Sequence, residues 1–329
     1  MILLTNNEGT LGVPTTARHL AENAPALDAI EAGIRLIEAD PSVRTVGRGG
    51  WPNLLCQLEL DACLMDGDTL RSGAVGALQG FLHPVSVARE VMRRLPHELL
   101  VGEGAARFAR EIGAEPAENL IEDSRRAWQA WYDAELSEAQ KRDWPEIPMA
   151  ELCRHAIDPE MVGEAGQDTT VFLAQDAHGT IGSGTSTSGW GWKYPGRLGD
   201  SPIVGAGSYA DSRYGAAACT GAGEMTIRCG TARSIVLYMK RGARVADAVL
   251  EAVDDMRALR GGLLSRVTIH AIDTRGNHKV VAVNGSRDNT YRLWEGRGEP
   301  RALPAEPVAI AAQYAKPTAS ARYGYGRSS

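Results

Sequence analysis

The sequence predicts an α+β protein in which helices pack on antiparallel sheets. Two stretches, 169–189 and 266–284, each contain two apolar runs on either side of a polar turn, which is typical of a β-hairpin. Apolar residues at helical spacing occur before the first stretch and between the two. The 37 glycines among 329 residues favour many turns over a helical bundle. Because helices and strands come in blocks, antiparallel sheets covered by helices fit better than a βαβ array.

The first part of the chain contains one predicted strand among several predicted helices. Apolar residues at helical spacing predict a helix within 24–41. Alternating apolar residues at 58–64 predict a strand that ends in a turn at Asp66-Gly67. Segments 86–95 and 102–113 predict two further helices.

The middle of the chain, from about 114 to 165, is its most charged part. An amphipathic helix is predicted within 124–144, and the polar "DPEMVGEAGQ" after it predicts an exposed linker that ends just before Thr169.

The second half begins with the 169–189 hairpin, which turns at 176–179. Two helices follow at 232–242 and 245–259, and the second hairpin turns at 275–277. The polar, glycine-rich end of the chain predicts a flexible tail over 300–329.

Composition excludes several classes of function. The net charge of −6 offers no electrostatic footprint for nucleic acid or an anionic membrane. The first residues lack a basic segment and a cleavage-site pattern, so we expect no secretory signal, and no 18-residue apolar stretch occurs. The sequence contains five cysteines and no CxxC motif, which predicts free thiols in a reducing cytoplasm.

One glycine-rich segment carries an arginine and an aspartate three residues apart. Arg197 could grip an α-carboxylate while Asp200 takes an α-ammonium, which together would hold an amino acid. A simple ion pair within the loop is the alternative. Downstream, Thr220 and Gly221 lie in a tight glycine turn that could stabilise an oxyanion or could be only a turn.

Other familiar sites are missing from the sequence. No GxGxxG follows a strand, no GxxxxGK[ST] occurs, and no HExxH or similar ligand cluster is present, so we expect neither a nucleotide nor a metal cofactor. A GxSxG elbow is also missing, which leaves a Ser-His-Asp hydrolase without support.

A threonine can act as a nucleophile without histidine if the chain is cut immediately before it. The new α-amino group then serves as the base, because its pKa lies near 7.7–8.0. This chemistry requires a threonine at the start of a strand, after an exposed linker. Thr169 meets both conditions, and Asp168 precedes it. Thr180, in "HGTIG", lacks a preceding aspartate and lies too close to "GTSTSG" to leave room for a strand and a turn between them.

These segments resemble the glycosylasparaginase branch of the N-terminal nucleophile hydrolases, a family that also includes plant-type asparaginases and isoaspartyl peptidases. "GQDTT" is similar to the family's cleavage motif, "GTSTSG" and "GRLGDSPIVGAGSYAD" to its pocket segments, and "GAAACTGAGE" to its oxyanion loop. The resemblance covers about residues 1–295. It implies one four-layer αββα domain, cut into an α chain of 1–168 and a β chain of 169–329, and a homodimer of such αβ units.

The resemblance also implies a role for each matching residue. Asp168-Thr169 would be the cleaved bond and Thr169 the nucleophile, with Thr187 hydrogen-bonded to it. Thr220 and Gly221 would stabilise the oxyanion, and Arg197 with Asp200 would clamp the substrate. Neither a metal nor another cofactor is implied, and the substrate would be a small asparagine derivative.

Three departures from the family pattern concern cleavage and the leaving group. Gln167 replaces a histidine, Thr170 replaces isoleucine or valine, and Asn7 is assigned to the position of a pocket tryptophan. Trp190 and Trp192 are candidates to supply aromatic surface instead, with ordinary packing as the alternative.

Three functions remain open. The first is hydrolysis of N4-substituted asparagine of the N4-(β-N-acetylglucosaminyl)-L-asparagine type. The second is the same chemistry on asparagine or β-aspartyl peptides. The third is an unprocessed, non-enzymatic protein that binds an amino acid.

Overall fold

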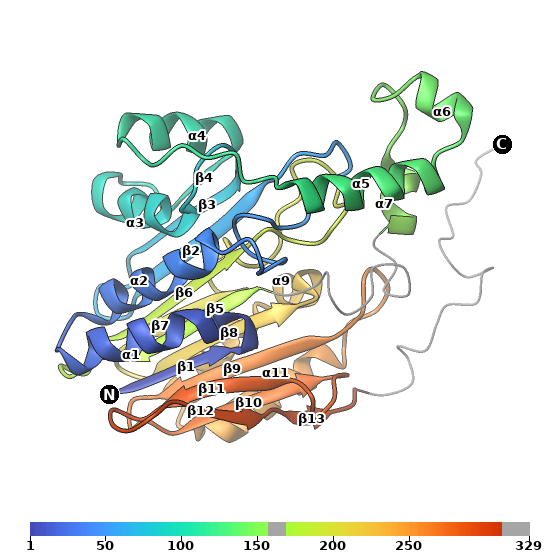
Figure 1. The fold of residues 1–329 in the computed structure, drawn as a ribbon. Helices are drawn as coiled ribbons and strands as arrows, with labels where there is room; N and C mark the ends of the chain where they lie inside the picture. Colours follow the sequence, from blue (N-terminus) through green and yellow to red (C-terminus); the bar gives the residue numbers. More distant parts are fainter. Residues whose placement is uncertain (157–168, 311–329) are drawn as a thin grey trace.

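The computed structural model describes residues 1–156 and 169–310, and two β-sheets packed face to face form its centre (Figure 1). The larger sheet has eight strands in the order β12-β11-β1-β5-β6-β2-β3-β4. These strands are β1 (Ile2–Asn6), β2 (Leu60–Asp66), β3 (Ser72–Leu78), β4 (Leu99–Val101), β5 (Thr170–Gln175), β6 (Ile181–Thr187), β11 (Thr290–Trp294) and β12 (Arg301–Pro304).

The smaller sheet has five strands in the order β13-β10-β9-β8-β7. These are β7 (Ser208–Asp211), β8 (Gly215–Gly221), β9 (Val267–Asp273), β10 (His278–Val283) and β13 (Glu306–Val308). The two predicted hairpins are confirmed as the antiparallel pairs β5–β6 and β9–β10. Two pairs, β3–β4 and β10–β13, are parallel because long connections separate their strands, so the sheets are mixed and not purely antiparallel.

Helices cover both outer faces, which gives the four-layer αββα arrangement expected for the fold (Figure 1). On the larger sheet lie α1 (Val13–Ala21), α2 (Ala26–Ala39), α3 (Pro84–Arg94) and α4 (Gly102–Glu111). On the smaller sheet lie α10 (Thr231–Lys240) and α11 (Val245–Met256). The short elements η1 (Asn7–Gly12) and α9 (Gly223–Cys229) follow β1 and β8. In α2, Ile30, Ile34 and Ile37 recur at helical spacing and are fully buried.

Side chains alternate along the central strands between a helix-facing layer and an inter-sheet layer. The inter-sheet core includes Ile2 and Leu4 of β1, Val171 and Leu173 of β5, Ile181 of β6, and Ala216 and Ala218 of β8. Continuing the alternation to the strand ends puts Asn6, Thr169, Thr187 and Thr220 on this same inter-sheet side. The sheets therefore bring polar residues from four strands to one end of the inter-sheet layer.

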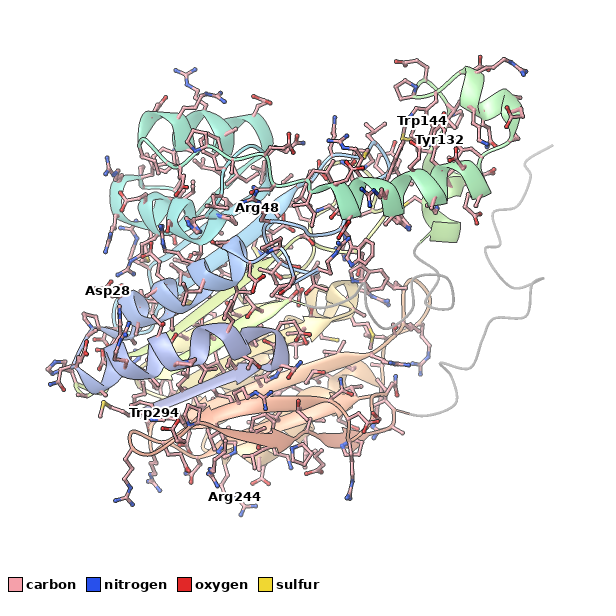
Figure 2. All side chains as sticks on the ribbon, viewed as in Figure 1. Asp28, Arg48, Tyr132, Trp144, Arg244 and Trp294 are labelled. Carbon is pink, nitrogen blue, oxygen red and sulfur yellow. The ribbon has the colours of Figure 1, made fainter. Side chains whose placement is uncertain are left out.

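Beyond the helical layers, an arm made of α5 (Glu122–Glu135), α6 (Glu138–Arg142) and α7 (Ala150–Ala156) projects from the body (Figure 1). Its aromatic rings pack together: Tyr132 and Trp144 lie side by side, with ring centroids 5.4 Å apart (Figure 2). Trp131 stacks at 5.7 Å on Trp192, in the loop after β6. This aromatic contact attaches the arm to the body.

The C-terminal prediction needs one correction. Residues 301–310 are not a flexible tail, because β12 pairs with β11 and β13 pairs with β10; residues 311–329 lie outside the described part.

All five cysteines are free, as predicted. No helix within residues 1–156 and 169–310 is long and apolar enough to cross a membrane.

Candidate active site

Thr169 lies immediately before β5, where the sequence predicts the nucleophile. Its neighbour Thr170 is paired with Ser186 of β6, so the same antiparallel register places Thr169 beside Thr187. Thr169 is buried, with 6% of its surface exposed. Gln167 and Asp168, the other residues of the predicted cleavage motif, lie outside the described residues.

The hydroxyl of Thr169 faces the hydroxyl of Ser201, and their two oxygens are 3.4 Å apart. Ser201 is 1% exposed, and its carbonyl accepts a hydrogen bond of 2.8 Å from the Thr185 hydroxyl of β6. The sequence pattern assigns Ser201 no role, although the residue lies within a predicted pocket segment. Its position directly after Asp200 is the signal that could have identified it.

Asn6, at the end of β1, holds the backbone around Thr169. Its side-chain nitrogen donates to the Thr169 carbonyl at 2.5 Å, and its side-chain oxygen accepts from the Val171 amide at 3.1 Å. The same nitrogen donates to the Glu8 carboxylate at 2.7 Å. A side-chain amide therefore bridges the nucleophile's backbone and a nearby negative charge.

Asn6 is the residue of the first strand that reaches the nucleophile's backbone, and Asn7, the residue assigned from the sequence to the position of the family's pocket tryptophan, follows it. Asn7 is exposed in η1, and its side-chain oxygen accepts hydrogen bonds from Thr290 and Arg292. The assignment of Asn7 to the tryptophan position stays a prediction.

Asp200 has a buried carboxylate, 3% exposed, without a salt bridge to another described residue. The Thr226 hydroxyl donates to it at 2.6 Å. Burial raises the pKa of Asp200 to about 6, although the Thr226 hydrogen bond and the charge of Arg197 both favour the ionised form. A buried carboxylate that forms no such ion pair is suited to receive an ammonium group.

Arg197 is paired with Glu224 and not with Asp200, so the simple loop ion pair considered from the sequence is not formed. Its Nε and one terminal nitrogen donate to the same Glu224 oxygen at 3.1 and 2.7 Å. The other terminal nitrogen lies near Gly189 and Gly199, where a β-carbon would approach it to 3.4 and 3.2 Å, respectively. These glycines leave that nitrogen room for a substrate carboxylate.

The loop that carries Arg197 is held in place by contacts with two buried charged residues, Lys193 and Glu59. Lys193, 1% exposed, donates to the Glu59 carbonyl at 3.1 Å and lies 3.9 Å from the Glu59 carboxylate. That carboxylate also accepts from the Gly196 amide at 3.0 Å. Burial lowers the pKa of Lys193, and the charges of Asp61 and Glu59 act in the opposite direction.

Thr187 and Thr220 bring two further hydroxyl groups to this end of the sheets. The Thr187 hydroxyl donates to the Thr45 carbonyl at 3.3 Å and accepts from the Gly189 amide at 2.9 Å. The Thr220 hydroxyl, 3% exposed, makes no hydrogen bond within the described part of the chain. Gly221, with φ of +101°, turns the backbone directly after it. The oxyanion role of Thr220 and Gly221 and the Thr187–Thr169 hydrogen bond stay predictions.

The two tryptophans considered as aromatic surface are packed. Trp190 is 4% exposed and donates to the Gly221 carbonyl at 3.4 Å, with the Arg197 guanidinium 5.7 Å from its ring centroid. Trp192 packs against Trp51 as well as against the arm. Thr180 lies between the 176–179 turn and β6, and its hydroxyl donates to Asp68 at 2.8 Å.

The hydroxyl pair of Thr169 and Ser201 thus lies beside the Asp200 carboxylate in the chain, and the Arg197 guanidinium is near enough for its charge to act on that carboxylate. These groups suit capture of an α-amino acid beside a threonine nucleophile. Over residues 1–156 and 169–310, no cluster of three or more His, Cys, Asp or Glu side chains is placed to hold a metal ion.

Comparison with known proteins gives a consistent result. The family model described as asparaginase matches residues 12–290. The chain is 36% identical to the N(4)-(β-N-acetylglucosaminyl)-L-asparaginase of Elizabethkingia miricola over 77% of this chain and 68% of that protein. It is 35% identical to a plant-type L-asparaginase of Pyrococcus abyssi, over 84% and 86% of the two chains. It is also 36% identical to an isoaspartyl peptidase of Salmonella typhimurium, over 83% and 82%.

Proposed function

Because the chain belongs to the asparaginase family, whose members hydrolyse amide carbon–nitrogen bonds, we propose that it is an autoprocessing threonine amidohydrolase acting on N4-substituted asparagine. In the first reaction the Thr169 hydroxyl attacks the carbonyl carbon of Asp168. The acyl group moves from nitrogen to oxygen, and water then releases the 1–168 chain. Thr169 is left with a free α-amine and a free hydroxyl.

In the catalytic cycle, that α-amine takes the proton of the Thr169 hydroxyl. The oxygen attacks the side-chain amide carbon of the substrate, and the amide nitrogen leaves as an amine after it receives the proton. Arg197 holds the substrate carboxylate, Asp200 holds its ammonium, and Thr220 with Gly221 stabilises the oxyanion. Water then hydrolyses the β-aspartyl–Thr169 ester, which releases aspartate and restores the hydroxyl.

One observation supports this proposal most strongly: the Asp200 carboxylate is buried without a salt bridge to a described residue, and the next residue, Ser201, contacts the Thr169 hydroxyl. Asp200, which we assign to the substrate ammonium, and Ser201, which contacts the nucleophile, are therefore consecutive residues. If this loop served stability alone, pairing or removing the Asp200 carboxylate would increase the free energy of unfolding, because an unpaired buried charge is costly.

The leaving group distinguishes the first function from the second. N4-(β-N-acetylglucosaminyl)-L-asparagine is the substrate type of our first choice, in line with the Elizabethkingia relative. The alternative is hydrolysis of asparagine or β-aspartyl peptides, which the similarity to a plant-type L-asparaginase and to an isoaspartyl peptidase supports.

The experiment compares kcat/KM for N4-(β-N-acetylglucosaminyl)-L-asparagine, β-aspartyl dipeptides and asparagine. We expect the glycosylated substrate to give the highest value. No turnover of that substrate, with turnover of the other two, would select the alternative. No turnover of any of them, together with a persistent single chain, would favour a non-enzymatic binding protein. The homodimer of αβ units stays a prediction, which sedimentation of the processed protein would test.

A further inference from the structure

Ser201 has a hydroxyl whose only hydrogen-bond partner among the described residues is the Thr169 hydroxyl, 3.4 Å away. The serine side chain is 1% exposed, so water does not compete freely for it. A buried hydroxyl that contacts the predicted nucleophile in this way is placed to influence the reaction.

The backbone of Ser201 is held on both sides. Its carbonyl accepts the 2.8 Å hydrogen bond from Thr185, in the strand adjacent to β5. The carbonyl of Asp200 accepts a 2.8 Å hydrogen bond from the Ile203 amide, which closes a turn around the serine. Ser201 is therefore positioned by the same hairpin that positions Thr169.

We propose that Ser201 is a further catalytic residue, whose hydroxyl donates a hydrogen bond to Oγ1 of Thr169; this inference rests on the proposed function. When the α-amine removes the proton of Thr169, the Ser201 donor stabilises the resulting negative charge and orients the attacking lone pair. When water breaks the β-aspartyl ester, Oγ1 leaves and gains negative charge again, and the same donor stabilises it. Ser201 keeps its own proton in both steps, so the α-amine remains the base.

The chain offers a matched control in a second pair of buried serines. Ser183 and Ser208 are 0% and 1% exposed, and their hydroxyl oxygens are also 3.4 Å apart. Their removal costs a comparable buried hydrogen bond without touching Thr169. Ser208→Ala therefore shows what loss of such a hydroxyl does to the fold alone.

The experiment compares wild type, Ser201→Ala, Ser201→Thr and Ser208→Ala, each as the full chain. For every protein we would follow cleavage at Thr169 by intact mass and the melting temperature, and then measure kcat and KM of the processed fraction. We expect Ser201→Ala to lower kcat roughly 10- to 100-fold and to slow autoprocessing, with KM changed less than about threefold. Ser201→Thr, which keeps the hydroxyl, should recover most of kcat, and Ser208→Ala should retain it.

Equal kcat in Ser201→Ala and wild type would overturn the inference, and so would equal losses in Ser201→Ala and Ser208→Ala. If Ser201→Ala fails to fold, Ser201→Thr provides the test instead. A Ser201→Thr variant that folds but is as inactive as Thr169→Ala would overturn the inference as well. An inactive, uncut wild type would instead refute the proposed function, so the two failures are distinguishable.

Discussion

The pKa of Asp200 leads to a prediction about substrate binding that can be worked out in numbers. Only the ionised carboxylate attracts an ammonium group, and the pKa of Asp200 is raised from 3.8 to about 6. With that pKa, the ionised fraction is about 0.9 at pH 7 and about 0.09 at pH 5. The affinity of the processed protein for L-aspartate should therefore be about tenfold weaker at pH 5 than at pH 7.

The same shift predicts an effect on stability with a definite sign. Because the folded pKa lies above the unfolded value, the protonated carboxyl stabilises the fold below about pH 3.8, and this stabilisation is lost as the pH rises through about 6. The difference of about 2 pKa units corresponds to about 3 kcal/mol. Asp200→Asn should thus unfold at a higher denaturant concentration than wild type at pH 7.5, while it loses L-aspartate binding.

The assay is titration calorimetry with L-aspartate between pH 5 and 7.5, combined with urea unfolding. Asp211→Asn is the control, because Asp211 is also buried but is paired with Arg213 at 2.8 Å. That variant should keep the pH dependence of binding. L-aspartate affinity that is unchanged between pH 5 and 7, or wild-type affinity in Asp200→Asn, would refute the assignment of Asp200 to the ammonium.

Two other substitutions test the surroundings of the clamp. Arg197→Lys keeps a charge but cannot hold Glu224 and a carboxylate with separate edges, so KM should rise at least about tenfold with a smaller change in kcat; an unchanged KM would contradict the carboxylate role. Lys193→Met leaves the buried Glu59 carboxylate without its cation and should lower the free energy of unfolding by about 3–5 kcal/mol. Lys240→Met, at an exposed position, should change it by less than about 1 kcal/mol, and equal effects in urea unfolding would argue against the buried pair.

Local patterns predicted the β5–β6 hairpin and, with it, the place of Thr169. The apolar run from Val171 to Ala174 and the turn after Asp176 depend on neighbouring residues only, so they can be read from the sequence. In β1, the alternating direction of strand side chains could have identified Asn6, because Ile2 and Leu4 face the inter-sheet layer and Asn6 continues that series.

Other features depend on contacts between distant parts of the chain. Glu224 pairs with Arg197 across 27 positions, and only the placement of α9 beside the loop after β6 creates that pair. The pairing of β12 with β11 and of β13 with β10 could not be predicted from the sequence either, because short edge strands in a polar segment resemble a flexible tail. Long-range packing of this kind has no local signature in one sequence.

The most direct test of the account is the intact mass of the purified protein, with Thr169→Ala and Thr180→Ala beside it. We expect wild type and Thr180→Ala to consist of two chains, 1–168 and 169–329, and Thr169→Ala to remain one chain. A wild-type protein that stays whole, or is cut elsewhere, would contradict the central claim that Thr169 becomes an N-terminal nucleophile.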